Sequence, residues 1–179
     1  MPATVKVWDP FVRVFHWSLV ASLAVAWLAA DETRIVHDLA GYAAGALVAS
    51  RLVWGLIGSR YARFTQFIRR PRKTLGYARD VLAGREARYL GHNPLGGVMI
   101  VWLLGAVAAV AVTGWLQTTD MFWGIEWVEE AHEVAANLML ALVGLHVAGV
   151  VFSSIRHREN LVRAMLTGRK AAASASDVS

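Results

Sequence analysis

The sequence predicts an all-α fold, an integral membrane bundle of four helices with both termini in the cytoplasm. Three observations support this prediction. Hydrophobic residues make up 56% of the 179 residues, the apolar residues gather in four long stretches, and most arginines lie in the connectors between those stretches. A helix of about 20 apolar residues spans the hydrocarbon layer of a bilayer, so each stretch is a candidate span.

The limits of the four spans are set by the charged residues, which are absent from a span or lie near one of its ends. We expect them at residues 14–30, 37–57, 93–119 and 132–155. Together they form one predicted domain over residues 1–170. The small, polar segment 171–179 is predicted to be disordered, because it has too little apolar surface to pack.

The first span has a second interpretation. A short basic segment, an apolar run and the small residues Ala29 and Ala30 are also typical of a secretory signal. We favour a retained helix, because three further spans follow and because cleavage would remove His16.

Lys and Arg in short loops predict the orientation. The connector 60–88 has nine basic residues against Asp80 and Glu86, whereas the loops 31–36 and 120–131 together contain Arg34 as their one basic residue among several acids. The connector and both termini are therefore expected in the cytoplasm. The basic residues of the connectors account for the net charge of +5. Because these residues have a role at the membrane and the sequence contains no glycine-rich phosphate loop, we expect no nucleic-acid partner.

The long connector allows two interpretations. It mixes arginines with Phe, Leu and Tyr, and the part after Pro71 could form a short helix in the membrane interface. The same composition also fits an ordinary basic cytoplasmic loop. Asn93 is a suitable N-cap for the next span, with Pro94 at its first helical position.

Cysteine is absent, which excludes disulfides, thiolate zinc sites, cysteine-ligated iron–sulfur clusters and thioether-attached haem. Histidine remains as the strong haem or metal ligand. His16 and His146 lie in the cytoplasmic halves of spans one and four. His37 and His132 begin spans two and four at the outer face.

The spacing of His132 and His146 is informative. Fourteen residues of helix separate them by about 21 Å along the axis and about 40° around it. Depth then pairs His146 with His16 and His132 with His37. The pattern predicts two bis-histidine centres, with haem favoured over zinc because most of the histidines have no neighbouring carboxylate or thiolate. Helix–helix hydrogen bonding is the alternative role for each histidine.

Arg51 lies fourteen residues after His37, on the same face and at the depth of the inner pair. It could pair with a haem propionate, or its long side chain could reach the cytoplasmic interface. Four glycines on the ligand helices could leave room for a flat cofactor or could allow close helix packing; they are Gly41, Gly45, Gly144 and Gly149.

Several motifs occur in order along residues 5–170, and together they resemble the bacterial cytochrome b561 family, which is related to the cytochrome b subunits of nickel–iron hydrogenases. They are Trp8-Asp9-Pro10, Arg13-x-x-His16-Trp17, His37-x-x-x-Gly41-Tyr42, Arg51-x-x-Trp54-Gly55, Gly91-His92-Asn93-Pro94, Thr113-Gly114-Trp115, Glu130-x-His132-Glu133 and Glu159-Asn160-Leu161. The resemblance implies a four-helix cytochrome of the bacterial cytoplasmic membrane with two haem b groups. It implies the same four ligands, His16, His37, His132 and His146.

The resemblance implies electron transfer between the quinone pool and a partner at the outer, periplasmic face, such as a c-type cytochrome or another redox subunit. The acidic outer loops favour a basic protein partner. One alternative is a superoxide oxidase that passes electrons from superoxide to ubiquinone, with Arg34 guiding the anion. A proton or metal transporter that uses the histidines as a relay is a third hypothesis.

Overall fold

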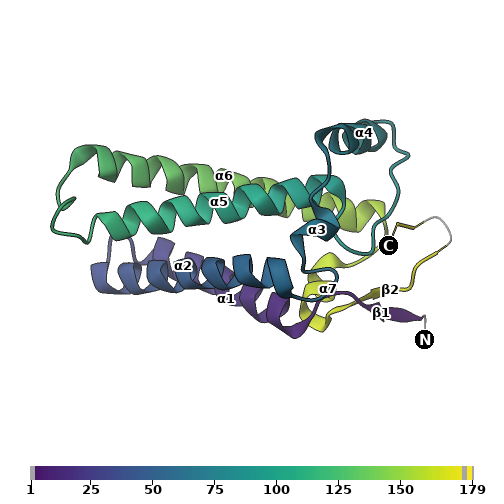
Figure 1. Ribbon diagram of the computed structural model, residues 1–179, viewed down its shortest axis with the longest axis horizontal. Helices are drawn as coiled ribbons and strands as arrows, with labels where there is room; N and C mark the ends of the chain where they lie inside the picture. The colour runs from purple at the N-terminus through teal and green to yellow at the C-terminus, as the bar shows by residue number, and fades with distance from the viewer. Residues whose placement is uncertain (1–2, 175–176, 179) are drawn as a thin grey trace. The chain divides into compact units, whose positions relative to one another are not determined.

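A computed structural model describes residues 3–174, 177 and 178. These residues are mostly helical, and they contain four helices that are long and apolar enough to cross a membrane (Figure 1). These are α1 (Pro10–Leu28), α2 (Arg34–Ile57), α5 (Pro94–Leu116) and α6 (Glu126–Arg156). The chain is therefore a multi-pass membrane protein.

Five shorter elements complete the described structure. They are α3 (Phe64–Phe67), α4 (Pro71–Leu82), α7 (Leu161–Thr167), β1 (Thr4–Lys6) and β2 (Arg169–Ala171). The two strands pair antiparallel, with Val5 opposite Lys170. The prediction of a purely α-helical chain omitted this sheet, because three-residue strands are too short to show an alternating pattern.

Three helices begin earlier than predicted, and one of them is α2, which was expected from His37 but begins at Arg34. The first span was expected from Val14, but α1 begins at Pro10, and the Asp9 side chain accepts a hydrogen bond from the Val12 amide at 2.9 Å. The fourth span was expected from His132, but α6 begins at Glu126. Acidic residues in the first turn of α6 stabilise that end, because they offset the positive pole of the helix.

Both ends of α5 have a local explanation. The predicted cap at Asn93 is confirmed, because its Oδ1 accepts a hydrogen bond from the Gly96 amide at 2.7 Å. The helix ends at Leu116, before the predicted Thr119. The hydroxyls of Thr118 and Thr119 each donate to a backbone carbonyl three residues earlier, which favours a turn over further helix.

The described residues form two compact units. One unit comprises Val14–Leu52 and Trp102–Gly144, which contain segments of all four long helices. Within it, the Tyr42 hydroxyl of α2 lies 2.9 Å from Oγ1 of Thr118 beyond α5. A Cβ added to Gly45 would lie 3.3 Å from Cβ of Ala111, so α2 and α5 pack closely there. Gly45 thus serves helix packing.

The other unit comprises the described residues of Met1–Arg13, Val53–Val101 and Leu145–Ser179. Its core joins both ends of the chain through buried side chains of Val7, Trp8, Val12, Ala62 and Ala164. The Val7 and Trp8 amides both donate to the Gly168 carbonyl, at 2.9 and 3.2 Å. The two strands adjoin the residues that make these bonds, because β1 ends at Lys6, just before Val7, and β2 begins at Arg169, just after Gly168.

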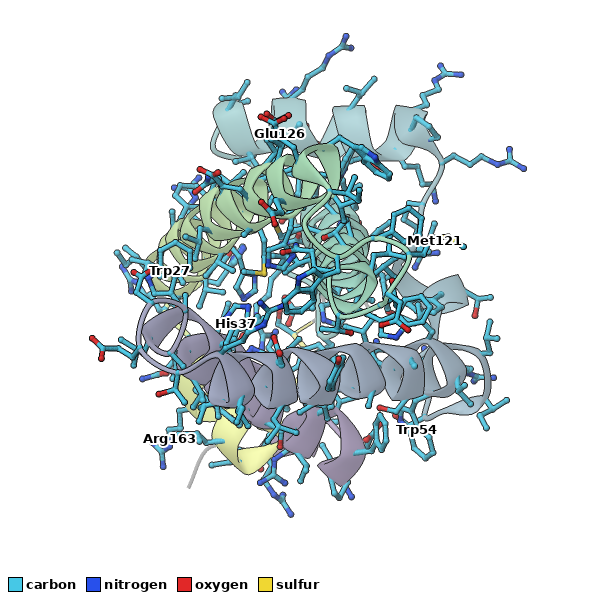
Figure 2. The ribbon with its side chains drawn as sticks, turned by 90° about the vertical axis from the view of Figure 1, so that its left-hand side faces the viewer. Trp27, His37, Trp54, Met121, Glu126 and Arg163 are labelled. Atoms are coloured by element: carbon cyan, nitrogen blue, oxygen red, sulfur yellow. The ribbon has the colours of Figure 1, made fainter. Side chains whose placement is uncertain are left out.

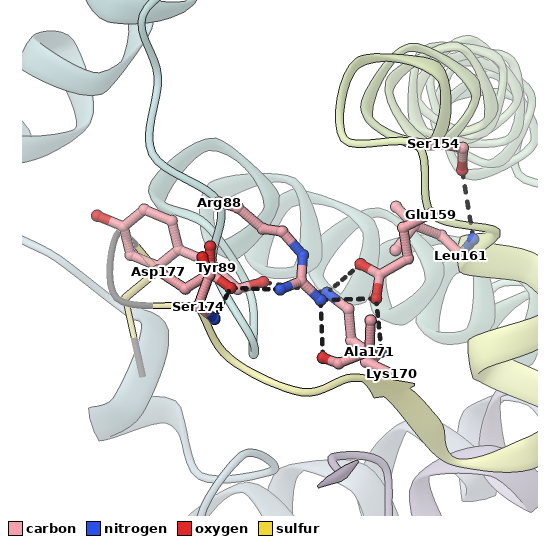
Figure 3. A network of polar contacts seen from close by, with 9 residues as sticks. All are labelled: Arg88, Tyr89, Ser154, Glu159, Leu161, Lys170, Ala171, Ser174 and Asp177. Carbon is pink, nitrogen blue, oxygen red and sulfur yellow. Dashed lines mark hydrogen bonds and ion pairs between the residues drawn. The ribbon is translucent and has the colours of Figure 1, made fainter. Parts of the chain in front are cut away.

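A network of charged groups in this unit centres on Arg88 (Figure 3). The Arg88 guanidinium pairs with Glu159 at 2.8 Å and also with Asp177. Lys170 is 6% exposed; its ammonium pairs with Glu159 at 3.1 Å and donates to the Tyr89 carbonyl at 3.0 Å. The network connects the α4–α5 connector to β2 and to the C-terminal segment.

This network bears on the predicted disorder of residues 171–179. Ala171 ends β2, and Asp177 accepts hydrogen bonds from Arg88 and from the Ser174 amide. Residues 175, 176 and 179 lie outside the described residues. Disorder of the whole segment stays a prediction.

Candidate functional site

The imidazoles of His37 and His132 lie together in the unit formed by Val14–Leu52 and Trp102–Gly144. Their ring centroids are 6.0 Å apart, and the ring planes are inclined at 75°. His37 lies in the first turn of α2, and His132 lies at the end of the second turn of α6. Figure 2 shows His37 on the inner side of these helices, whereas Trp27 and Glu126 lie at the periphery.

The His37 ring is oriented by the end of α1. Its Nδ1 lies 2.8 Å from the Ala26 carbonyl oxygen. Ala26 is in the last turn of α1, where carbonyls have no intrahelical partner. A carbonyl can only accept, so Nδ1 carries the proton and donates it.

The His132 ring is oriented by α5. Its Nδ1 lies 3.1 Å from the Val110 carbonyl oxygen and 3.1 Å from Oγ1 of Thr113. The Thr113 hydroxyl also lies 2.8 Å from the Ala109 carbonyl, to which it donates. Its oxygen can therefore accept from Nδ1 of His132 at the same time.

Both histidines thus have the same protonation pattern. Donation from Nδ1 leaves the lone pair on Nε2, which is the nitrogen available to a metal ion. Metal-bound histidines commonly donate their other ring nitrogen to a carbonyl, which fixes the ring and makes the ligand more basic. The paired rings therefore have the tautomer and the support that a bis-histidine centre requires.

The distance between the rings also fits one metal atom between them. Two metal–nitrogen bonds of about 2 Å, with about 1 Å more from each nitrogen to its ring centre, place the ring centroids roughly 6 Å apart. The observed centroid distance is 6.0 Å. Among residues 3–174, 177 and 178, no group of three or more His, Asp or Glu side chains could hold a bare metal ion. Two imidazoles suit a cofactor that supplies the remaining ligands itself, as haem does.

Glycines leave space around the pair. A Cβ added to Gly114 would lie 3.0 Å from Cε1 of His132, so this glycine makes room for the ring. A Cβ added to Gly41, which lies about one turn after His37 on α2, would meet no atom within 4 Å. Gly41 thus borders open space, as a flat cofactor requires, in contrast to the packed Gly45. A Cβ added to Gly144 would also meet no atom within 4 Å, but Gly144 lies two residues before His146, away from this pair.

A cavity of about 370 Å³ borders the two rings. Arg34 lines it and lies over the Trp123 ring at 4.3 Å, with its Nε 3.7 Å from a carboxylate oxygen of Asp38. Glu129 also lines the cavity. Its wall therefore contains one basic residue and two acidic ones.

The other predicted site residues lie as follows. His16 is half-buried on α1, with its ring 5.0 Å from that of Trp17. Arg51 on α2 is only 3% exposed, so its charge is buried. His146 is half-buried on α6 and belongs to the other compact unit. The structure thus brings His37 and His132 together within one unit, and their role as ligands stays a prediction, as do those of His16, His146 and Arg51.

The sequence indicated the two histidines but not what orients them. Thr113 and Gly114 stand together in the Thr-Gly-Trp motif, which contains no titratable group and so suggested no role at the site. The backbone carbonyls of Ala26 and Val110 have no signature in the sequence. Their contribution depends only on where helices end and pack.

Comparison with known proteins gives two results. A family model described as prokaryotic cytochrome b561 matches residues 7–168. A probable Ni/Fe-hydrogenase B-type cytochrome subunit from Cupriavidus necator is 22% identical over 211 aligned positions, which cover 90% of this chain and 85% of that protein. No solved structure matches.

Proposed function

The chain belongs to the prokaryotic cytochrome b561 family, and from this premise we propose that it carries two b-type haems and transfers electrons between the quinone pool and a partner at the outer face of the bacterial cytoplasmic membrane. Membership in the family makes the chain a membrane cytochrome that transfers electrons through b-type haem. The two haems, quinone, the outer partner and the inner membrane are the proposal. The observation that carries it is the His37–His132 pair.

In this proposal, His37 and His132 hold the outer haem through Nε2, and His16 and His146 hold the inner one. Haem supplies a one-electron iron couple when bound. The chain contributes ring orientation, because the carbonyls of Ala26 and Val110 hold the Nδ1 protons of His37 and His132. These bonds make each imidazole a stronger donor to the iron, which is one way in which a protein tunes a reduction potential.

Arg51 is proposed to balance the charge of an inner haem propionate. Arg51 is 3% exposed and lies within a membrane-spanning helix. A buried cation requires a compensating anion or strong hydrogen bonds. A propionate is an anion of the kind that an arginine binds well.

The outer partner is proposed to be a protein with a basic docking surface, such as a c-type cytochrome or another redox subunit. Around the His37–His132 site, Asp38 and Glu129 line the cavity together with Arg34. The loop 120–125 and the start of α6 add Asp120, Glu126 and Glu130. Complementary charge steers the encounter of redox proteins and raises their association rate.

One observation favours a second candidate, a superoxide oxidase with ubiquinone as the electron acceptor. Arg34 lines the cavity that borders both imidazoles, so a small anion could approach there. Asp38 and Glu129 oppose this attraction. Stopped-flow mixing of purified protein with superoxide separates the two functions: fast haem reduction followed by quinone reduction supports the oxidase, and no reaction without a protein partner supports the electron conduit.

The His37–His132 assignment is tested by measuring haem per chain with the pyridine haemochrome assay. Wild type is expected to contain two haems, and His37→Ala and His132→Ala about one each. His157→Ala is the matched control, because His157 lies outside the predicted pairs, and it should retain two. Full haem content in His132→Ala would overturn the assignment.

A fold defect is separated from ligand loss by a second variant. His132→Gly leaves space for free imidazole, which can replace the missing side chain. Added imidazole should restore the second haem during reconstitution of this variant. Haem loss that imidazole does not restore, from a protein with wild-type helix content, would contradict direct ligation by His132.

A further inference from the structure

The short helix α4 exposes one face on which arginine and leucine alternate. Arg72, Leu75, Arg79 and Leu82 follow each other at spacings of three, four and three residues, which places them on one side of a helix. All four are exposed, and the leucines are 62% and 90% exposed. Large apolar side chains this open to solvent, between two cations, indicate a surface with a partner.

The opposite face of α4 is packed against its own unit. Tyr77 is 8% exposed, and its ring lies 5.5 Å from that of Tyr89 in an edge-to-face arrangement. Burial, with the nearby Glu86 and Tyr89, raises the pKa of Tyr77 to about 12, so the phenol stays neutral. The orientation of α4 is therefore fixed, and the Arg–Leu face must point away from this packing.

The chain holds α4 close to one end of the membrane spans. α4 lies in the chain between Ile57 of α2 and Pro94 of α5, with residues 58–70, which include α3, on one side and residues 83–93 on the other. Just after α4, the Gly84 carbonyl and the Glu86 carboxylate both accept hydrogen bonds from Arg156, with Arg156 Nε 2.8 Å from Glu86 Oε1. Arg156 is the last residue of α6. The C-terminal end of α4 is thus tied to the end of a spanning helix.

The charge of this segment is strongly positive. Its basic residues are Arg69, Arg70, Arg72, Lys73 and Arg79. The acid within α4 is Asp80, whose carboxylate pairs with Arg85 at 3.2 Å. Basic clusters beside a membrane span attract anionic lipids, and an amphipathic helix with arginines and leucines lies in the interface plane.

We propose that α4 lies in the membrane interface and binds the headgroups of anionic phospholipids through Arg72 and Arg79, with Leu75 and Leu82 at the boundary of the acyl chains. The surface belongs to the leaflet at which α2 ends, α5 begins and α6 ends. The proposal stands apart from the haem assignment, because it uses none of the four histidines.

Immersion of the leucines is tested by site-directed spin labelling of the full chain in nanodiscs. The sequence has no cysteine, so Leu75→Cys, Leu82→Cys and Lys73→Cys each introduce a single labelling site. Labels at 75 and 82 should collide more with oxygen than with a water-soluble nickel chelate. The label at Lys73, exposed but off this face, should show the reverse. Equal preference for the nickel chelate at all three positions would overturn the proposal.

Headgroup binding is tested with a fluorophore on Leu75→Cys in detergent, titrated with short-chain phosphatidylglycerol. Replacing Arg72 or Arg79 by Gln in this labelled protein should weaken binding about fivefold each, since one cation near an anionic surface has an effect of that size. Arg158→Gln, an exposed arginine outside α4, is the control and should leave binding unchanged.

Three further outcomes would contradict the proposal. An equal response to short-chain phosphatidylcholine would show that the headgroup charge is irrelevant. An equal response to inorganic phosphate would show a simple anion site. Unchanged affinity in Arg72→Gln and Arg79→Gln, with saturable binding intact, would place the lipid elsewhere and leave this face for a protein partner.

Discussion

The Thr113 hydroxyl oxygen of α5 lies 3.1 Å from Nδ1 of His132 of α6. The contact joins two helices that follow each other in the chain, and it orients one of the two imidazoles of the candidate haem site. The same nitrogen also lies 3.1 Å from the Val110 carbonyl. One helix therefore supplies two acceptors for a single proton, and this arrangement holds the ring against rotation.

Removal of this hydroxyl is expected to weaken haem binding at the outer centre. Thr113→Val keeps the shape of the side chain but loses the acceptor, and supporting groups of this kind change metal affinity by about 10-fold or more. Thr113→Ser should retain wild-type behaviour. Transfer of haem to apomyoglobin measures the loss, and the potential of one centre should shift in Thr113→Val alone. Equal haem release from both variants would show that the hydroxyl has no role.

Gly114→Ala is expected to displace the His132 ring. The added Cβ would lie 3.0 Å from Cε1 of His132, which is closer than side chains normally pack. Gly105→Ala is the matched control on the same helix, because its added Cβ would meet no atom within 4 Å. Gly114→Ala should lower haem content and broaden the low-spin electron paramagnetic resonance signal of one centre, whereas Gly105→Ala should change neither. A wild-type spectrum for Gly114→Ala would contradict the predicted crowding.

Acid is expected to destabilise the unit that contains the Arg88 network. Burial alone would raise the pKa of Glu159, but Arg88 and Lys170 outweigh burial and hold this pKa below its ordinary value. A carboxyl with a lowered pKa in the folded state stabilises the fold above its unfolded pKa of about 4.3. That stabilisation is lost as the pH falls through the folded-state pKa.

Glu159→Gln tests this expectation. At neutral pH it removes the ion pairs with Arg88 and Lys170, and loss of a hydrogen bond to a charged group costs about 1.5–3 kcal/mol. The difference in Tm between wild type and Glu159→Gln should be largest at neutral pH and should shrink below about pH 4. A difference that does not change with pH would show that the carboxylate charge contributes nothing.

Asp9→Ala is expected to loosen the start of α1 from its surroundings. The Asp9 carboxylate caps α1 through the Val12 amide and accepts hydrogen bonds from the Trp54 indole at 3.2 Å and from the Ser59 hydroxyl. Loss of an N-cap costs about 1 kcal/mol, and the two side-chain partners add to this value. Asp9→Asn, which can still cap, should be milder. Thermal unfolding followed by tryptophan fluorescence measures both, and equal Tm values for the two variants would contradict the capping role.

The sequence by itself determined the number and approximate positions of the membrane spans, the cap at Asn93, the helix after Pro71 and membership in the cytochrome family. These features depend on local composition and on short motifs, which a single chain displays directly. Helical spacing also pointed to His37 and His132 as a pair, because the depth of a residue follows from its distance along a span.

Only the tertiary structure decided which groups support that pair and how the chain ends are held. The carbonyls of Ala26 and Val110 meet the imidazoles because helices end and pack where they do. The pairing of Thr4–Lys6 with Arg169–Ala171, and the ion pairs of Arg88, join residues that are far apart in the sequence. Such contacts exist only once the chain has folded, because backbone groups and isolated charges have no periodic pattern that identifies their partners.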